Sequence, residues 1–166
     1  DFKNSTSLIE KALELSPNKQ SIIFELALNY LNIGKPSEAL NILEKAYLSA
    51  TDNDTSKTAY IIALISNNQD KKARQIFGND NAIFNDPIII NAYISNKEYD
   101  KAISIYKKNL IKDPNNQDIY SAIVSIYLLA KQPNMAIQTL KSAQNKFPLL
   151  KAQIDSIIKQ IQEGKY

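Results

Sequence analysis

Apolar residues recur along this chain at the spacing of amphipathic helices. Leu26, Ala27 and Tyr30 stand at positions i, i+1 and i+4, so they share one face of a helix. Only three glycines occur, which argues against an all-β fold with many tight hairpins. The pattern predicts helices near residues 3–15, 19–33, 36–50, 54–67, 70–77, 86–95, 98–112, 116–130, 133–146 and 148–163.

Prolines mark the boundaries of these predicted helices. Pro114 follows a predicted helix end, because the residue before a proline avoids the α region. Pro36, Pro87 and Pro133 stand near predicted helix starts, where the missing N–H costs little. Asp86, directly before Pro87, has the side chain of a helix N-cap.

The predicted helices form an internal repeat. Ala39 and Ala73 lie 34 residues apart, and so do Ala102 and Ala136, whereas Ala73 and Ala102 lie 29 residues apart. Small alanines allow two paired helices to approach closely, and large neighbours fill the space beside them. Each alanine is followed four positions later by a large apolar residue, which is in turn Leu43, Phe77, Tyr106 and Leu140.

Two phrases upstream of these alanines carry a family resemblance. Ile23-x-x-Leu26-Ala27-x-x-Tyr30 precedes Ala39, and Tyr120-x-x-Ile123-Val124-x-x-Tyr127 precedes Ala136. With the 34-residue period and the turn Asp113-Pro114-Asn115-Asn116, they resemble the tetratricopeptide repeat family. The resemblance implies an all-α fold, a right-handed α-solenoid of antiparallel helix pairs. It implies about four repeats, a partial N-terminal unit and a C-terminal capping helix.

These units divide a single repeat domain, 1–166, into consecutive segments. The expected bounds are 1–17 for the partial unit, 18–53, 54–82, 83–116 and 117–148 for the repeats, and 149–166 for the cap. The middle departs from the family pattern, since Lys57 replaces a large apolar residue and Asn109 replaces an alanine. Five residues are missing between Phe77 and Tyr93, and Gly78 to Asn81 suggests a loop there. One helix of this region is therefore expected to be short.

The last predicted helix has the pattern of a cap. Its apolar stripe consists of Ile154, Ile157, Ile158 and Ile161, and its charged residues lie elsewhere on the helix. Terminal repeats need a polar outer face to stay soluble. We expect this helix to cover the last full repeat.

Composition restricts the chemistry of the chain. It contains no cysteine and no histidine, which excludes thiol and histidine catalysis and zinc sites, so we expect no cofactor, no metal and no enzyme. The net charge is only +3 and Arg74 is the sole arginine, so a nucleic-acid partner is not expected. No apolar run is long enough to span a bilayer, so we expect no membrane insertion by this chain. Compartment and oligomeric state stay open.

The family resemblance implies a protein or peptide partner, bound in a concave groove lined by the first helix of each repeat. Phe24 and Leu28 stand where the chaperone-binding branch of the family has Lys and Asn, so that branch is not expected. For Ile65, Ile94 and Leu128, groove exposure and packing between units both stay open. The expected groove residues carry no formal charge and are Phe24, Leu28, Leu31, Asn32, Thr58, Ile62, Ser66, Asn91, Ser95, Ser121, Ser125 and Leu129.

Two further patterns have competing interpretations. The chain contains nine tyrosines, which we interpret as packing residues of the repeat rather than as a base-stacking surface or an aromatic cage. The tail from Phe147-Pro148 through Ile157 to Lys165 is similar to the tails of bacterial O-antigen ligase-like membrane proteins. That similarity implies an alternative function, a soluble accessory domain of a membrane glycan-assembly protein.

Overall fold

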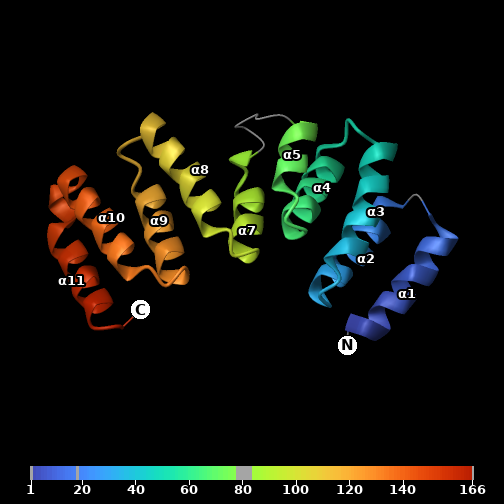
Figure 1. The fold of residues 1–166 in the computed structure, drawn as a ribbon, viewed down its shortest axis with the longest axis horizontal. Helices are drawn as coiled ribbons and strands as arrows, with labels where there is room; N and C mark the ends of the chain where they lie inside the picture. Colours follow the sequence, from blue (N-terminus) through green and yellow to red (C-terminus); the bar gives the residue numbers. More distant parts are fainter. Residues whose placement is uncertain (1, 18, 78–83, 166) are drawn as a thin grey trace. The chain divides into compact units, whose positions relative to one another are not determined.

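The computed structural model describes residues 2–17, 19–77 and 84–165, and within these ranges it contains helices and turns but no β-strand (Figure 1). The predicted all-α fold is confirmed, and the observed helix ends lie within three residues of the expected ones. The elements are α1 (Phe2–Leu15), α2 (Gln20–Asn32), α3 (Pro36–Ser49), α4 (Asp54–Ser66), α5 (Asp70–Phe77), α7 (Pro87–Ser95), α8 (Tyr99–Lys112), α9 (Gln117–Leu129), α10 (Pro133–Lys146), the 3-10 turn η1 (Pro148–Leu150) and α11 (Lys151–Gln162).

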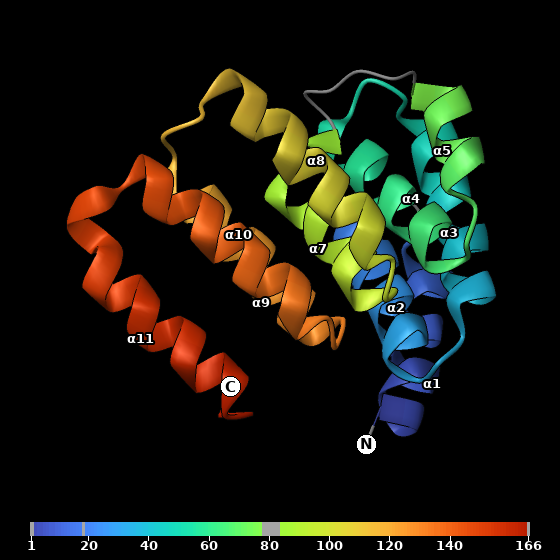
Figure 2. The same cartoon turned by 60° about the vertical axis from the view of Figure 1, so that its left-hand side comes forward.

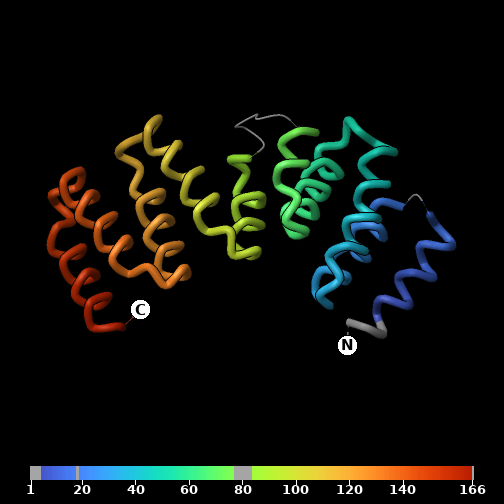
Figure 3. Tube along the Cα trace, viewed as in Figure 1, coloured from blue at the N-terminus to red at the C-terminus, as the bar shows by residue number. Residues whose placement is uncertain are grey.

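The chain forms two compact units, residues 1–92 and 93–166, with the boundary inside α7. In the first unit α1 packs on α2, α2 on α3, α3 on α4 and α4 on α5. This order can be followed along the trace in Figure 3. In the second unit α8 packs on α9, and α10 contacts both α9 and α11 (Figure 2). Each unit is thus a stack of helices that are consecutive in sequence. The expected repeat bounds stay a prediction.

The four periodic alanines lie in the interior of this packing. Ala39, Ala73, Ala102 and Ala136 are all 0% exposed, as the spacing predicted. Leu43 is buried beside the first of them, and Leu140 beside the last. A methyl side chain at these positions allows paired helices to approach, and the larger neighbours fill the remaining space.

The backbone repeats the same turn after each first helix of a pair. The N–H that follows the turn residue bonds to a carbonyl five residues earlier at 2.8 Å, as from Lys35 to Tyr30 and from Gln132 to Tyr127. This bond closes the helix end, and the residue just before its N–H donor is left-handed. The left-handed residues, spaced by 34, 29 and 34, are Gly34 (φ 74°), Asn68 (φ 58°), Lys97 (φ 59°) and Lys131 (φ 57°).

The last helix ends in the same way. Gly164 has a φ of 71°, and the Lys165 N–H bonds to the Gln160 carbonyl at 2.9 Å. By its backbone, α11 is therefore equivalent to the first helix of a pair. By its side chains it is a cover, because Ile154, Ile158 and Ile161 are buried.

One residue of the expected apolar stripe departs from this pattern. Ile157 is 41% exposed, whereas the other three isoleucines of the expected stripe are buried. Ile154, Ile158 and Ile161 follow the i, i+4, i+7 spacing of one helix line, and Ile157 lies at the edge of that line. Its side chain lines a hollow between α9 and α11.

The middle of the chain is shortened in two helices. Here α5 has 8 residues and α7 has 9, whereas α2 and α3 have 13 and 14. The expected loop at residues 78–81 lies outside the described residues. The predicted cap at Asp86 is confirmed, because its carboxylate accepts a bond from the Ile88 N–H at 2.8 Å. Shortening is therefore shared by the two helices, where the sequence had allowed either one.

A polar cluster fastens the short α5 to its neighbours in the first unit. The Tyr60 hydroxyl donates to Glu44 Oε1 at 2.5 Å, and Lys72 Nζ donates to the same oxygen at 3.1 Å. The Tyr47 ring stacks on Tyr60 with centroids 5.3 Å apart. These bonds, first that of Tyr60 and then that of Lys72, lower the pKa of the Glu44 carboxyl. Residues from α3, α4 and α5 are thus joined at one point.

The tyrosines mostly have packing roles. Tyr60, Tyr93 and Tyr127 are buried, and Tyr30 is half-buried with its hydroxyl donating to Glu10 of α1. That bond to a carboxylate raises the pKa of Tyr30 to about 12. Their burial supports interpreting them as core residues of the repeat.

Candidate peptide-binding face

The twelve expected groove residues lie on α2, α4, α7 and α9, which are the first helices of the pairs. None of them is in the buried core. The half-buried members are Phe24, Leu31, Thr58, Ile62 and Ser66. The exposed members are Leu28, Asn32, Asn91, Ser95, Ser121, Ser125 and Leu129.

The sequence left open whether Ile65, Ile94 and Leu128 face the groove or pack between helices. The structure shows a different burial for the first of them than for the other two. Ile65 is fully buried, so it packs in the core and does not line a binding face. Ile94 and Leu128 are half-buried and keep some accessible surface. Leu128 also lines a hollow, described below.

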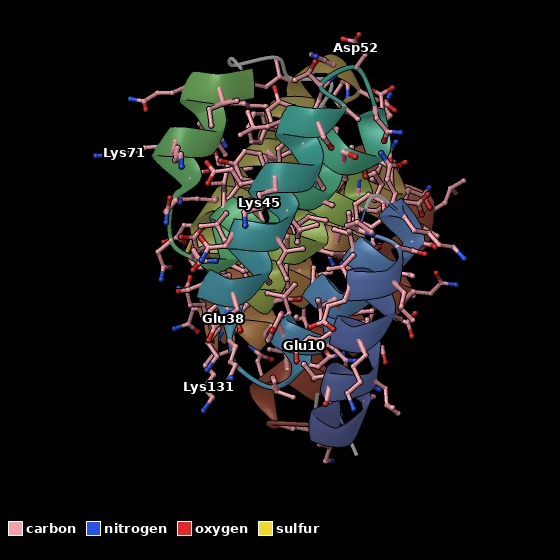
Figure 4. All side chains as sticks on the ribbon, turned by 90° about the vertical axis from the view of Figure 1, so that its right-hand side faces the viewer. Glu10, Glu38, Lys45, Asp52, Lys71 and Lys131 are labelled. Carbon is pink, nitrogen blue, oxygen red and sulfur yellow. The ribbon has the colours of Figure 1, made fainter. Side chains whose placement is uncertain are left out.

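Formal charge in the first unit lies mainly on the second helices and the turns. Figure 4 shows Glu38 and Lys45 on α3, Lys71 on α5 and Asp52 in a turn, all exposed. By contrast, Phe24 and the other expected groove residues are uncharged. The first unit therefore has faces of different chemistry.

A hollow of about 380 Å³ lies between α4 and the start of α7 in the first unit. The expected residues Thr58 and Ile62 line it, together with Ala59 and Ile88. Two carboxylates that the sequence prediction did not include, Asp54 and Asp86, also line it. The signal that could have found them is their place at helix starts, since the first helices of neighbouring pairs begin at the same end of a repeat stack.

Both carboxylates already have partners. Asp54 pairs with Lys57 at 3.2 Å, and Asp86 caps α7 through the Ile88 N–H. An ion pair within one helix turn leaves little net field at the surface. These groups therefore add polarity to the rim of the hollow without making it a strong cation site.

A larger hollow, of about 430 Å³, lies in the second unit between α9 and α11. The expected residues Ser121 and Ser125 line it, and Leu129 does not. None of its lining residues carries a formal charge. They are Gln117, Tyr120, Ser121, Val124, Ser125 and Leu128 from α9, Leu140 and Ala143 from α10, Phe147 and Leu150 from the connection, and Gln153, Ile154 and Ile157 from α11.

Hydrogen bonds and ring contacts within the chain fix several walls of this hollow. The Tyr120 ring meets the Phe147 ring edge to face, with centroids 5.7 Å apart. The Ser121 hydroxyl donates to the Gln117 carbonyl at 3.1 Å. Sequence reasoning missed the α11 wall because it assigned that helix a covering role only. The edge position of Ile157 in the isoleucine stripe is the signal that could have found it.

The described residues offer no metal site and no membrane-spanning helix. Within the described residues, no group of three or more Asp, Glu, His or Cys side chains is placed to hold a metal ion. No described helix combines the length and apolar character that crossing a bilayer requires.

Comparison with known proteins agrees with the repeat. Residues 93–161 match a family model described as tetratricopeptide repeat. A crystal structure of MamA protein is 24% identical with a TM-score of 0.52, covering 92% of this chain and 86% of that chain. A crystal structure of YrrB, described as a TPR protein with an unusual peptide-binding site, is 19% identical with a TM-score of 0.47, covering 89% and 78%.

No curated protein sequence matches the chain. The MamA similarity shows a shared helical fold, and the family match confirms the resemblance found in the sequence. The similarity of the tail to O-antigen ligase-like proteins stays a prediction.

Proposed function

Residues 93–161 match the tetratricopeptide repeat model. From this match we propose that the protein is a non-catalytic scaffold that binds a segment of another polypeptide on the exposed faces of its first helices. One observation supports this proposal above the others. The twelve expected groove residues all stay outside the buried core, although five of them are Phe, Leu or Ile residues, whose usual place is a core. Their accessible surface is available to a partner.

Binding on these faces depends on apolar contact more than on charge. Leu28 in the first unit and Leu129 in the second are each 58% exposed, and none of the twelve residues is charged. Covering such surface stabilises a complex by roughly 25 cal/mol per Å² before the entropy of association is subtracted. Affinity should therefore change little between low and high salt.

A selection of random peptides tests this proposal without a known partner. Twelve-residue peptides displayed on phage are selected on the full chain, synthesised, and titrated by fluorescence polarisation. We expect Leu28→Ser or Leu129→Ser to weaken the selected peptides about tenfold, since each removes an accessible apolar contact.

Matched controls come from the second helices. Leu48 of α3 is 67% exposed and Ile111 of α8 is 82% exposed, so Leu48→Ser and Ile111→Ser remove comparable apolar surface elsewhere. These two variants should bind the peptides as the original chain does. A selection that yields no peptide, or equal losses in all four variants, would remove the proposed function.

A further inference from the structure

Two serines, Ser121 and Ser125, line the hollow between α9 and α11. Counted back from the left-handed turn residue, Ser121 and Ser125 lie ten and six positions before Lys131. In the first full repeat, Phe24 and Leu28 lie ten and six positions before Gly34. The same two sites of the repeat therefore hold large side chains on α2 and small ones on α9.

The missing volume at these sites is bounded by α11. Ile157 faces the hollow and keeps 41% of its surface accessible, and Leu128 and Val124 line the opposite side on α9. The volume of about 430 Å³ lies near the lower end of small-ligand pockets, which span about 300–1,000 Å³. Such a space accepts one or two large side chains but not a whole helix.

The absence of charged residues from the hollow favours an uncharged occupant. No lining residue is charged, and on α11 Lys151 pairs with Asp155 at 2.7 Å, so this helix brings no free charge to the rim through them. A charged side chain placed here would lose its hydration without gaining an ionic partner. An apolar side chain would instead bury itself against Ile157 and Leu128.

We propose that this hollow is an anchor site for one bulky, uncharged apolar side chain, such as leucine, methionine or phenylalanine, of the partner peptide. The inference rests on the proposed function and deepens it, because it names the side-chain class and the place of contact. It also gives α11 a second role, since one wall of the site comes from the helix that covers the last repeat.

Capped amino-acid amides probe the site directly. N-acetyl-leucinamide, N-acetyl-phenylalaninamide and N-acetyl-lysinamide are titrated into the full ¹⁵N-labelled chain and followed by NMR. We expect the leucine and phenylalanine amides to shift signals of α9 and α11, and the lysine amide to leave them unchanged. Equal shifts with all three amides, or none with any, would overturn the anchor site.

A filled hollow is the matched variant. Ser121→Phe together with Ser125→Leu copies the side chains of the first full repeat into α9, and we expect the variant to stay folded with a melting temperature no lower than before. The amide shifts should disappear and selected peptides should bind at least tenfold more weakly. Leu149→Ser is the control, because Leu149 is 97% exposed and does not line the hollow.

Two outcomes separate this inference from the function that it deepens. If selected peptides respond to Leu28→Ser but not to the filled hollow, the anchor site is wrong and the scaffold function stands. If the double variant fails to fold, Ile157→Ser tests the same wall, since Ile157 lines the hollow and is 41% exposed. A fivefold weaker peptide affinity in that variant supports the site, and unchanged affinity overturns it.

Discussion

The first full repeat and the last one have similar interiors and different accessible faces. Both close their first helix on a left-handed residue, Gly34 or Lys131, and both place a fully buried alanine, Ala39 or Ala136, against it. On the accessible face, however, the first repeat shows large apolar side chains where the last shows serines. The turn and the alanine fix the backbone, so residues on the accessible face are free to differ and can define where a partner binds.

The interior comparison extends to large core positions. Leu26 and Ile123 stand at the same place in the two repeats, and both are buried. Tyr30 and Tyr127 also correspond, but Tyr30 is half-buried and reaches Glu10, whereas Tyr127 is buried. Similar packing is therefore reached with different degrees of burial, and the difference is largest towards the surface.

The largest expected effect on stability comes from removing α11, the helix that covers the last repeat. A chain ending after Phe147 loses the cover formed by Ile154, Ile158 and Ile161. We expect the second unit to lose about 3 kcal/mol of unfolding free energy and to associate through the uncovered face. Urea unfolding and sedimentation velocity measure both, and a monomeric truncated chain of equal stability would contradict the covering role.

Overpacking tests whether the two interiors are equivalent. Ala39→Leu and Ala136→Leu each force extra methylene groups into a site that is 0% exposed. Each should cost about 1–3 kcal/mol, because tightly packed helices cannot move apart without losing other contacts. Urea midpoints of the two variants should fall together. An unchanged midpoint at one position would show that its repeat is packed less closely than the other.

Substitutions at the two left-handed turn residues, Gly34 and Lys131, should change the stability of the fold in opposite directions. Gly34→Ala places a side chain at a φ of 74° and should cost about 1 kcal/mol through strain alone, since nothing lies within 4 Å of the added carbon. Lys131→Gly relieves strain at a φ of 57° and should stabilise by roughly 0.5–1 kcal/mol. Thermal melting checks both signs. A stabilising Gly34→Ala would refute the shared turn.

The smallest expected effect concerns pH and belongs to the first unit. The folded-state pKa of Glu44 lies below its ordinary value of 4.5, so its contribution to stability is present above that value and is lost as pH falls below it. Glu44→Gln should flatten the decline of the urea midpoint between about pH 5 and pH 3. Asp52→Asn, at an exposed turn, is the control for removing one carboxylate.

Sequence patterns predicted the helices and the buried alanines because both depend on short-range spacing. The intervals between Ala39, Ala73, Ala102 and Ala136 correspond to the length of one helix pair with its turns. The hollows were harder to predict, because they depend on which side chains from separate helices meet in space. Ile157 shows this well, since helical spacing placed it in the apolar stripe but could not show that its edge position faces Ser121 and Ser125 across a gap.

The degree of burial of apolar residues near the surface could not be predicted from the sequence either. Ile65 and Leu128 are both large apolar residues late in a first helix, yet one is fully buried and the other half-buried. The same limit applies to Asp54 and Asp86, whose approach to one hollow depends on how the two helix starts are placed.

Packing between consecutive helices has a consequence for folding speed. The helices that pack extensively are neighbours along the chain, so contact order is low and each unit should fold rapidly, one hairpin after another. Loss of structure can begin at an end in the same stepwise way. A peptide that holds α9 and α11 together would slow that unzipping at the C-terminal end, and occupancy of the hollow would then be measurable as kinetic stability.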